Sequence, residues 1–398
     1  MSEAGTSETL QVDPGALMSG AAWRALVDVM RNMERHVYGD ARTNDPLLRA
    51  EGFRYLLRLL ESGHFFAVEI ADPDYPQLAR LFNTYQQLGN MNPDCVYMYA
   101  RIDGSKTYRI HGKRGSARLF EVSTMNAHML AHPNHKELGT LTDVKTDADG
   151  RVEVVLSPEP HEGNWLRTDA EATWIYVRQY YYDWEAETPA DVVIERVGAT
   201  YPPPPLNIGQ MAQCSSDLIR LLPGWAQSLA NFVQSYYAAP ANELNFVQSK
   251  SGMKGLYYGK GHFDIGPDEA AIVELEAPRC PYWSFQLMNH YWESLDFHLR
   301  QTSLNGHQAH LDPHGVFRAV IAHSDPAVPN WLDPAGHGKG LICARVLRPT
   351  TAPQTRVRVV PLKDLRDHLP PATPAVSREQ RQELLRRRML SVMRRFRE

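Results

Sequence analysis

The spacing of apolar side chains changes from a helical to a strand pattern after the first quarter of the chain. Within residues 19–92, apolar side chains such as Leu26 and Met30 recur every three or four positions, which predicts helices with one buried face. After Asn92-Pro93, short runs alternate apolar and polar side chains and end at turn residues such as Asp103-Gly104. This alternation is typical of strands in an antiparallel sheet.

The β-rich part contains an internal repeat. Three pairs of segments match in the same order: residues 99–108 with 273–282, Asn164–Leu166 with Asn330–Leu332, and Arg178 with Arg345. One such match arises easily by chance, but three in one order at similar spacings predict a duplicated module. Because the strands are short and many, we expect each module to be a sandwich of jelly-roll type rather than a set of β-α-β units.

These patterns predict a mainly β fold with helical additions (α+β). Helical spacing returns between the two modules and is interrupted at Pro223-Gly224, which predicts two bridging helices. The predicted order is a disordered N-terminus (1–18), an N-terminal helical region (19–92), a first β-sandwich module (93–205), bridging helices (206–254), a second β-sandwich module (255–370) and a basic amphipathic C-terminal helix (371–398).

The C-terminal helix is expected to dock on a protein surface. Ser377 and Gln380 form a capping-box pattern, and an apolar stripe runs from Leu385 to Phe396 among many arginines. A basic amphipathic helix also suits an acidic membrane surface, but this apolar face is short. The favoured expectations are docking onto the protein's own domain or formation of a homo-oligomer through this helix.

Composition and charge exclude several classes of function. The chain of 398 residues has a formal net charge of −4, so no overall positive field attracts nucleic acid. No stretch of about 18 apolar residues occurs, and the first 14 residues lack an export signal, so we expect a soluble cytoplasmic protein without a membrane span. The four cysteines form no C-x-x-C pair, which favours reduced thiols.

Several motifs between residues 90 and 350 resemble those of the domain-of-unknown-function 1214 family, a group of uncharacterised bacterial proteins. The resemblance rests on Asn92–Asp94 with Tyr97, Tyr108–Gly112, Trp283 with Gln286 and Asn289, Ser303–Asn305, Asp325-Pro326, and Asn330–Asp333. It implies a two-module β-sandwich architecture and brings no established reaction. The helical N-terminus and the basic C-terminus lie outside it.

One strand of the first module carries an arginine among aromatic side chains. Because side chains alternate along a strand, Trp174, Tyr176, Arg178 and Tyr180 share one face. Such a face predicts a platform that stacks a sugar ring or an apolar ligand, with Arg178 binding a carboxylate or sulfate. The alternative is cation–π packing between the sheets, without a ligand.

The second module is rich in titratable side chains. We expect His290 and Asp296 to form an acid–base pair, because a carboxylate fixes the tautomer of a histidine that titrates near neutrality, and Arg300 to anchor the substrate. Further candidate ligand contacts are Gln286, Asn289, Asn305 and His337. The alternative is that these side chains belong to a solvated strand end and its loop.

Metal and cofactor sites are less favoured. His307, His310 and His314 surround a predicted hairpin at Asp312–Gly315, but they lack a tight metal-binding spacing, and we assign no metal ligand. The chain has no P-loop, no nucleophile elbow and no G-x-G-x-x-G at the start of a helix, so no cofactor is expected.

Three functions are compatible with these residues. The first is an enzyme that acts on a small organic metabolite by acid–base chemistry, of hydrolase or lyase type, with its cavity in or between the β modules. The second is a non-catalytic carbohydrate-binding, small-ligand-binding or assembly protein, since sandwiches often serve such roles. The third is a metal-dependent enzyme.

Overall fold

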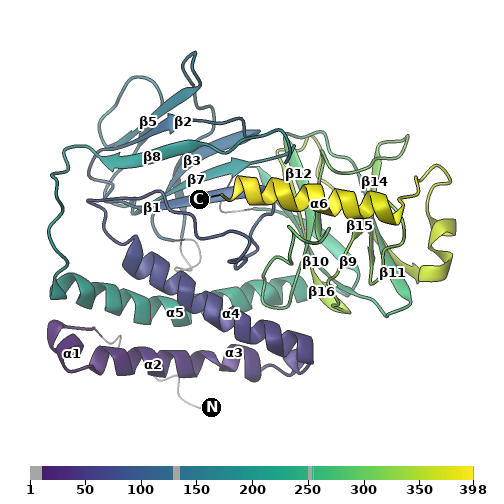
Figure 1. Cartoon of the computed structure of the whole chain (residues 1–398), viewed down its shortest axis with the longest axis horizontal. Helices are drawn as coiled ribbons and strands as arrows, with labels where there is room; N and C mark the ends of the chain where they lie inside the picture. Colours follow the sequence, from purple (N-terminus) through teal and green to yellow (C-terminus); the bar gives the residue numbers. More distant parts are fainter. Residues whose placement is uncertain (1–10, 129–134, 250–252, 254, 398) are drawn as a thin grey trace.

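A layer of helices lies against two β modules in the computed structural model, which describes residues 11–128, 135–249, 253 and 255–397 (Figure 1). The elements before the first module are α1 (Pro14–Met18), α2 (Ala21–Met33), α3 (Arg35–Tyr38), η1 (Ala41–Thr43), α4 (Pro46–His64) and η2 (Phe65–Glu69). Helix α4 begins at a side-chain cap, because Asp45 accepts hydrogen bonds from the backbone amides of Leu47 (2.9 Å) and Leu48 (3.1 Å).

The first module is a sandwich of two four-stranded sheets. Its strands are β1 (Cys95–Arg101), β2 (Tyr108–Lys113), β3 (Leu119–Met125), β4 (Glu137–Leu141), β5 (Arg151–Ser157), β6 (Trp165–Arg167), β7 (Trp174–Tyr180) and β8 (Asp191–Arg196). One sheet has the order β1-β7-β3-β4 and the other has the order β6-β5-β2-β8. Consecutive strands β1, β2 and β3 therefore alternate between the sheets instead of pairing as hairpins.

The second module repeats this arrangement after helix α5 (Ile208–Tyr237). Its strands are β9 (Glu243–Gln248), β10 (Leu256–Asp264), β11 (Glu269–Glu276), β12 (Tyr282–Met288), β13 (Ser303–Asn305), β14 (Val316–Ala322), β15 (Trp331–Leu332), β16 (Lys339–Leu347) and β17 (Thr355–Pro361). The sheet orders are β9-β10-β16-β12-β13 and β15-β14-β11-β17. Apart from the additional β9, each strand from β10 to β17 holds the place of one strand from β1 to β8.

The internal repeat predicted from the Asn-Trp-Leu motif is confirmed. In the first module the indole of Trp165 donates to the carbonyl of Ser157 at 3.3 Å, and in the second the indole of Trp331 donates to the carbonyl of Ala322 at 2.8 Å. Both tryptophans lie on a short strand that pairs in parallel with its neighbour, β5 or β14. The two motifs therefore perform one structural task in two copies of a sandwich.

One of the three predicted matches is wrong. The sequence alignment placed residues 99–108 opposite residues 273–282, which equates β1 with β11. In the structure β1 corresponds to β10 and β2 to β11, because these pairs hold the same places in their sheets. The physical reason is that the chain crosses from one sheet to the other after β1. A strand–turn–strand pattern recurs at each such crossing, so two copies can be aligned with an offset of one strand.

The largest hydrophobic core joins the helical layer to the first module. The ring of Phe66 in η2 contacts the rings of Tyr99, Trp174 and Trp225, with centroid distances of 5.2, 5.6 and 5.5 Å. All seven residues of β7 are buried, because one face of this strand lies in the sandwich and the other faces the helices and the second module. A second core fills the space between the sheets of the second module.

Several boundaries differ from the prediction. The helices before the first module end at Glu69 and not near residue 92, and residues 243–248, predicted within the bridging helices, form strand β9. The bridging region is one continuous helix, α5, with Pro223 inside it, and not two helices. Packing against α4 and η2 holds both sides of the proline in line, which a local sequence pattern does not reveal. Residues 14–18, expected to be disordered, form α1, capped by the side chain of Asp13; residues 1–10 lie outside the described residues.

The C-terminal helix α6 (Arg378–Arg395) follows a 3-10 helix, η3 (Leu362–His368), and lies across both modules of its own chain (Figure 1). Its buried arginines make the contacts: Arg381 donates to Gln301 at 2.9 Å, Arg388 donates to the hydroxyl of Ser303, and Arg395 donates to the carbonyl of Pro93. The expected docking onto its own domain is thus what this helix does. Three of its arginines are buried, whereas Val392 is the buried member of the predicted apolar stripe and Leu385, Met389 and Phe396 are half-buried. The face of α6 that was expected to bind a second copy of the chain contacts the protein's own modules.

Candidate functional site

A cavity of about 370 Å³ lies between the two modules and helix α5. Strands β1 and β7 of the first module and β10 and β16 of the second contribute side chains to its wall, together with α5. Small-molecule sites typically have volumes of about 300–1,000 Å³, aromatic walls and a few polar groups. This cavity has all three properties.

Two equivalent residue pairs, one from each module, line this cavity. In the first module, Tyr97 of β1 lies opposite Arg178 of β7. In the second module, Tyr258 of β10 lies opposite Arg345 of β16. Strands β1 and β10 hold the same place in the two modules, as do β7 and β16. The duplication therefore brings two copies of one tyrosine–arginine pair to a single cavity.

Arg178 is paired with carboxylates. Its guanidinium lies 2.5 Å from a carboxylate oxygen of Glu121 and 3.4 Å from one of Glu137, and it donates to the hydroxyl of Ser123 at 3.1 Å. Burial raises the pKa of Glu121, and the positive charge of Arg178 and the hydrogen bond to it oppose that rise. The charge of Arg178 is therefore compensated within the first module.

Arg345 is held by neutral groups. Its guanidinium donates to the amide oxygen of Gln286, to the backbone carbonyl of Asn90 at 2.6 Å and to the side-chain oxygen of Asn90 at 2.8 Å. Only 3% of its surface is exposed, and among the described residues no carboxylate forms an ion pair with it. Gln286 is fixed in turn, because its amide donates to Asn90 and to Ser294.

Aromatic side chains form the apolar part of the wall. The rings of Phe232 and Trp292 are stacked, with centroids 4.3 Å apart and planes 9° from parallel. Burial raises the pKa of Tyr97 well above its usual value, and burial also raises the pKa of Tyr258, although the charge of Arg345 opposes both shifts. At neutral pH the wall thus presents neutral phenols and two guanidinium groups.

The predicted aromatic face of β7 divides between core and cavity. Arg178 and Tyr180 line the cavity, as a ligand-binding face requires. Trp174 instead lies beneath the guanidinium of Arg101, with 5.3 Å between the guanidinium carbon and the ring centroid, and Tyr176 packs edge-on against Tyr99. Trp174 and Tyr176 thus pack against other side chains of the protein, as the alternative to a ligand platform predicted, and they do not line the cavity.

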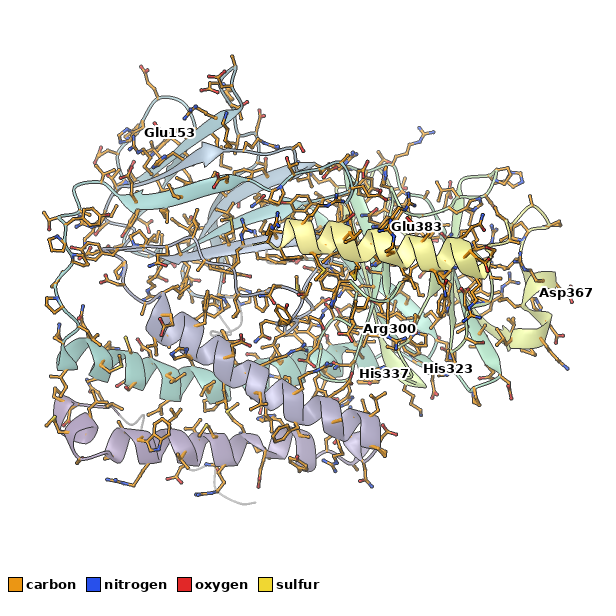
Figure 2. The ribbon with its side chains drawn as sticks, in the orientation of Figure 1. Glu153, Arg300, His323, His337, Asp367 and Glu383 are labelled. Carbon is orange, nitrogen blue, oxygen red and sulfur yellow. The ribbon has the colours of Figure 1, made fainter. Side chains whose placement is uncertain are left out.

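Two of the three predicted catalytic residues, His290 and Arg300, take part in separate contacts. His290 is buried, with its ring nitrogens 3.4 Å from a carboxylate oxygen of Asp40 and 3.2 Å from the hydroxyl of Tyr237, and the space beside it measures about 40 Å³. Its carboxylate partner is therefore Asp40 and not Asp296. Arg300, labelled in Figure 2, is exposed, and it forms an ion pair with Asp333 at 2.7 Å. Sequence proximity suggested one site, but His290 contacts Asp40 in the helical layer and Arg300 contacts Asp333 in a loop of the second module.

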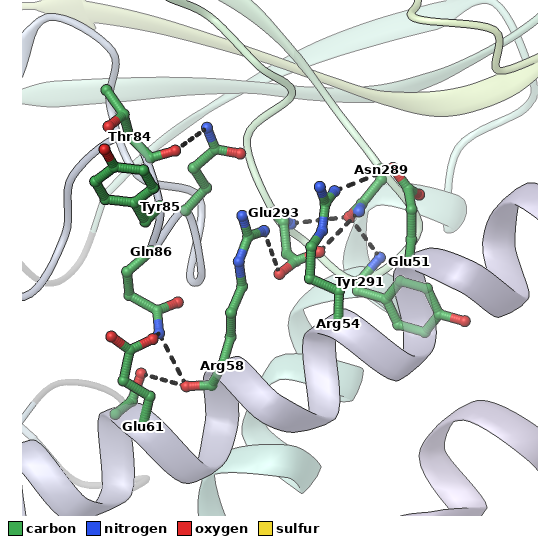
Figure 3. Close-up of polar contacts among 12 residues, drawn as sticks. Glu51, Arg54, Arg58, Glu61, Thr84, Tyr85, Gln86, Asn289, Tyr291 and Glu293 are labelled. Carbon is green, nitrogen blue, oxygen red and sulfur yellow. Dashed lines mark hydrogen bonds and ion pairs between the residues drawn. The ribbon is translucent and has the colours of Figure 1, made fainter. Parts of the chain in front are cut away.

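Asn289 and Asn305 hold the structure together. The amide of Asn289 donates to Glu293 at 2.9 Å and orients this carboxylate toward Arg58 of α4 (Figure 3). The amide of Asn305 donates to Asp94 of the first module at 2.7 Å. Both are buried and neither lines the cavity, whereas Gln286 acts at its edge by holding Arg345.

His337, one of the candidate ligand contacts, instead pairs with Glu51 of α4. Its side chain is buried, with one ring nitrogen 2.9 Å from a carboxylate oxygen of Glu51 and the other 2.8 Å from the carbonyl of Pro334. Burial disfavours the charged imidazole, but the hydrogen bond and the charge of Glu51 outweigh burial, so the pKa of His337 is raised. This pair connects the second module to α4.

The His337–Glu51 pair predicts a pH-dependent stability. Because the folded-state pKa of His337 lies above its unfolded value, its contribution is complete below the unfolded pKa and is lost as the pH rises through the folded pKa. His337→Asn should therefore lower the free energy of unfolding more at about pH 5.5 than at about pH 8.5. Urea denaturation at both pH values measures this, and His161→Asn at an exposed position is the control. Equal losses at both pH values would contradict the pairing.

The histidines around residues 307–314 do not gather. Asp312 accepts hydrogen bonds from the guanidinium of Arg318 and from backbone amides of its own turn, including that of Val316 at 2.9 Å. Within residues 11–128, 135–249, 253 and 255–397, no group of three or more His, Cys, Asp or Glu side chains is arranged to hold a metal ion.

In the same part of the chain, no helix combines the length and apolar character needed to cross a bilayer.

Comparisons with known proteins identify the family. The model of a family described as "Protein of unknown function (DUF1214)" matches residues 98–182. A crystal structure of an uncharacterised protein from Burkholderia cenocepacia is 31% identical in sequence, covers 88% of this chain and 99% of its own, and superposes with a TM-score of 0.84. The chain belongs to the DUF1214 family.

Other comparisons of this DUF1214 chain add less. The VPA0106 protein from Vibrio parahaemolyticus is 11% identical over 77% of this chain and 97% of its own, with a TM-score of 0.44. No curated protein matches the chain. The matched segment 98–182 includes β7 and Arg178, so part of the cavity wall lies in the segment that the DUF1214 model matches.

Sequence reasoning named Arg178 but missed Arg345, Tyr97 and Tyr258. A signal for Arg345 was present, because the repeat places it at the position of Arg178. A candidate site in one copy of a duplicated module therefore points to the equivalent residues of the other copy. The two tyrosines follow only once the β1/β7 and β10/β16 registers are known.

Proposed function

We propose that the protein binds a small organic ligand in the cavity between its two modules. The observation that carries this proposal is the meeting of the two Tyr–Arg pairs, Tyr97 with Arg178 and Tyr258 with Arg345, at one space of about 370 Å³ with aromatic walls. A cavity of this kind needs no metal and no cofactor to hold a ligand, because guanidinium groups and aromatic rings fix and cover it.

A larger side chain at one position of the cavity wall tests this proposal. Val247 of β9 lines the cavity and is 49% exposed, so a larger side chain is tolerated there without disturbing a core. Val247→Trp should weaken binding of naphthalene-2-carboxylate by about tenfold or more, measured by titration calorimetry, since the indole occupies the ligand's path. The matched control is Val193→Trp on β8, at a position that is 55% exposed and does not line the cavity.

Two results would oppose the proposal. One is the failure of naphthalene-2-carboxylate, its amide and a panel of aliphatic acids to bind at all. The other is binding that Val247→Trp and Val193→Trp affect equally, because the ligand would then lie outside the cavity.

Acid–base catalysis on the bound ligand, of hydrolase or lyase type, is a second candidate function. The observation that favours it is the phenol of Tyr258 beside the guanidinium of Arg345, whose charge lowers the cost of phenolate formation in a buried site. These residues take the place that the sequence assigned to His290 and Asp296. The test is to incubate the protein with a cell metabolite extract. Turnover of a metabolite by the wild type that is lost in Tyr258→Phe, while this variant still binds naphthalene-2-carboxylate, supports catalysis. If the wild type changes no metabolite, the protein binds its ligand without converting it.

A further inference from the structure

We propose that the cavity selects ligands that carry one anionic group and an aromatic or apolar body, and that Arg345 binds the anion. The inference rests on the cavity being the ligand site and adds the chemical class of the ligand. It comes from a difference between the two copies of the module, at the position that faces each arginine.

The repeated positions facing the two arginines carry different side chains. In the first module, Glu121 of β3 lies opposite Arg178 of β7. In the second module, Ser284 of β12 lies opposite Arg345 of β16. The hydroxyl of Ser284 lies 2.7 Å from the hydroxyl of Tyr282, in hydrogen-bond contact, and carries no charge. One copy therefore supplies an anion for its arginine, and the other does not.

The neutral partners of Arg345 orient it without compensating its charge. Gln286 and Asn90 accept hydrogen bonds from its terminal nitrogens and fix the guanidinium plane. Amide and carbonyl oxygens satisfy donors, but a buried charge without a counter-ion remains costly. An anionic ligand group in the adjoining cavity would offset this cost and would form charge-assisted hydrogen bonds.

The remaining charges of the cavity have the same sign. Lys260 of β10 also lines it, and its ammonium lies 5.7 Å from the ring centroid of Tyr236. Among the described residues, the cavity wall contains no Asp or Glu side chain. A net positive wall in a site of low dielectric attracts anions and disfavours cations.

The ligand is expected to carry one anionic group and not two. Arg178 already lies within 4 Å of both Glu121 and Glu137, so a second anionic group near it would meet two carboxylates. The stacked rings of Phe232 and Trp292 offer an apolar surface for the rest of the ligand. The selected class is therefore a monoanion with an aromatic or apolar body.

Three matched probes test this class by titration calorimetry: naphthalene-2-carboxylate, the neutral naphthalene-2-carboxamide and naphthalene-2,6-dicarboxylate. The wild-type protein should bind the monocarboxylate about tenfold or more tightly than either of the others. Arg345→Gln should weaken monocarboxylate binding by about 10- to 100-fold and leave carboxamide binding within about twofold. Arg345→Lys, which keeps the charge, should retain part of the preference.

A gain of binding gives a second test that does not depend on removing Arg345. Glu121→Gln preserves the shape of the side chain and removes one of the carboxylates beside Arg178. It should raise the affinity for the dicarboxylate about tenfold, because Arg178 then becomes available to a second anionic group. Arg300→Gln, at an exposed ion pair of the second module, is the control and should change none of the three affinities.

The outcomes separate the two proposals. If none of the three probes and none of the aliphatic acids binds, both proposals fail. If the probes bind and Val247→Trp blocks them, but the carboxamide binds as tightly as the carboxylate, the ligand site stands and the anion selectivity is wrong. An unchanged preference in Arg345→Gln, or an unchanged dicarboxylate affinity in Glu121→Gln, also overturns the selectivity.

Discussion

Replacing Asp94 with alanine is expected to lower the free energy of unfolding by roughly 3–5 kcal/mol. Asp94 is 2% exposed and accepts hydrogen bonds from the indole of Trp184 (2.7 Å), the amide of Asn305 (2.7 Å) and the hydroxyl of Tyr282 (2.6 Å). The first donor belongs to the first module and the other two belong to the second. Alanine would leave the indole of Trp184 buried without an acceptor, and would leave Asn305 and Tyr282 with their longer contacts to Tyr182 (3.1 Å) and Asn92 (3.1 Å).

Urea denaturation followed by circular dichroism measures this loss. The control is Asp28→Ala, because the ion pair of Asp28 with Arg31 is mostly exposed and its loss should cost less than about 1 kcal/mol. A loss in Asp94→Ala no larger than in the control would show that this carboxylate does not hold the modules together. The cavity between the modules depends on this junction, so Asp94→Ala should also weaken naphthalene-2-carboxylate binding.

Glu293→Ala is expected to cost a similar roughly 3–5 kcal/mol, for a different reason. Glu293 is fully buried and lies 2.9 Å from the guanidinium of Arg58 in α4, and the amide of Asn289 orients it (Figure 3). Burial raises the pKa of Glu293, and the charge of Arg58 opposes the rise. Removing the carboxylate leaves the cation of Arg58 buried without its partner.

The double variant Glu293→Met with Arg58→Met distinguishes an unpaired charge from lost packing. Removing both partners eliminates the uncompensated charge, so the double variant should unfold with a smaller free-energy loss than Glu293→Ala alone. Denaturation of the single and double variants under the same conditions measures this. A double variant that is less stable than Glu293→Ala would contradict this expectation. It would mean that the attraction between Glu293 and Arg58 exceeds the cost of burying the two charges.

The sequence predicts the architecture well because alternation and repetition are local properties. The Asn164–Leu166 and Asn330–Leu332 motifs mark equivalent parallel strands, since in both modules the indole must reach a carbonyl of the neighbouring strand. The continuity of α5 through Pro223 is not predictable in this way, because packing against α4 and η2 decides it. The same holds for the strand order, in which β1 pairs with β7 across a long stretch of chain.

The candidate site is only partly predictable, because its residues meet through tertiary structure. Arg178 and Tyr180 follow from alternation along one strand, and Gln286 follows from the polar face of β12. The partners of His290 and His337, which are Asp40 and Glu51, lie more than two hundred residues away in the helical layer. Sequence proximity therefore favoured Asp296 for His290, although a carboxylate from another element occupies that place.

Duplication followed by divergence gives the cavity its polarity. Two copies of one tyrosine–arginine pair face a shared space. The arginine of the first module lies opposite the carboxylate of Glu121, whereas the arginine of the second lies opposite the hydroxyl of Ser284, so the two halves differ in charge. A single module would leave this face of its sheet exposed, whereas two modules and α5 enclose it. The ligand site that we propose is therefore a property of the pair of modules and not of either one.

A crystal structure of the protein with naphthalene-2-carboxylate bound is the most direct test of whether the paired modules form one ligand site. We predict that the naphthyl ring lies between the modules beside Phe232 and Trp292, with its carboxylate in hydrogen-bond contact with Arg345. A ligand bound outside this space, or a carboxylate directed at solvent while Arg345 keeps only its neutral partners, would contradict the proposal.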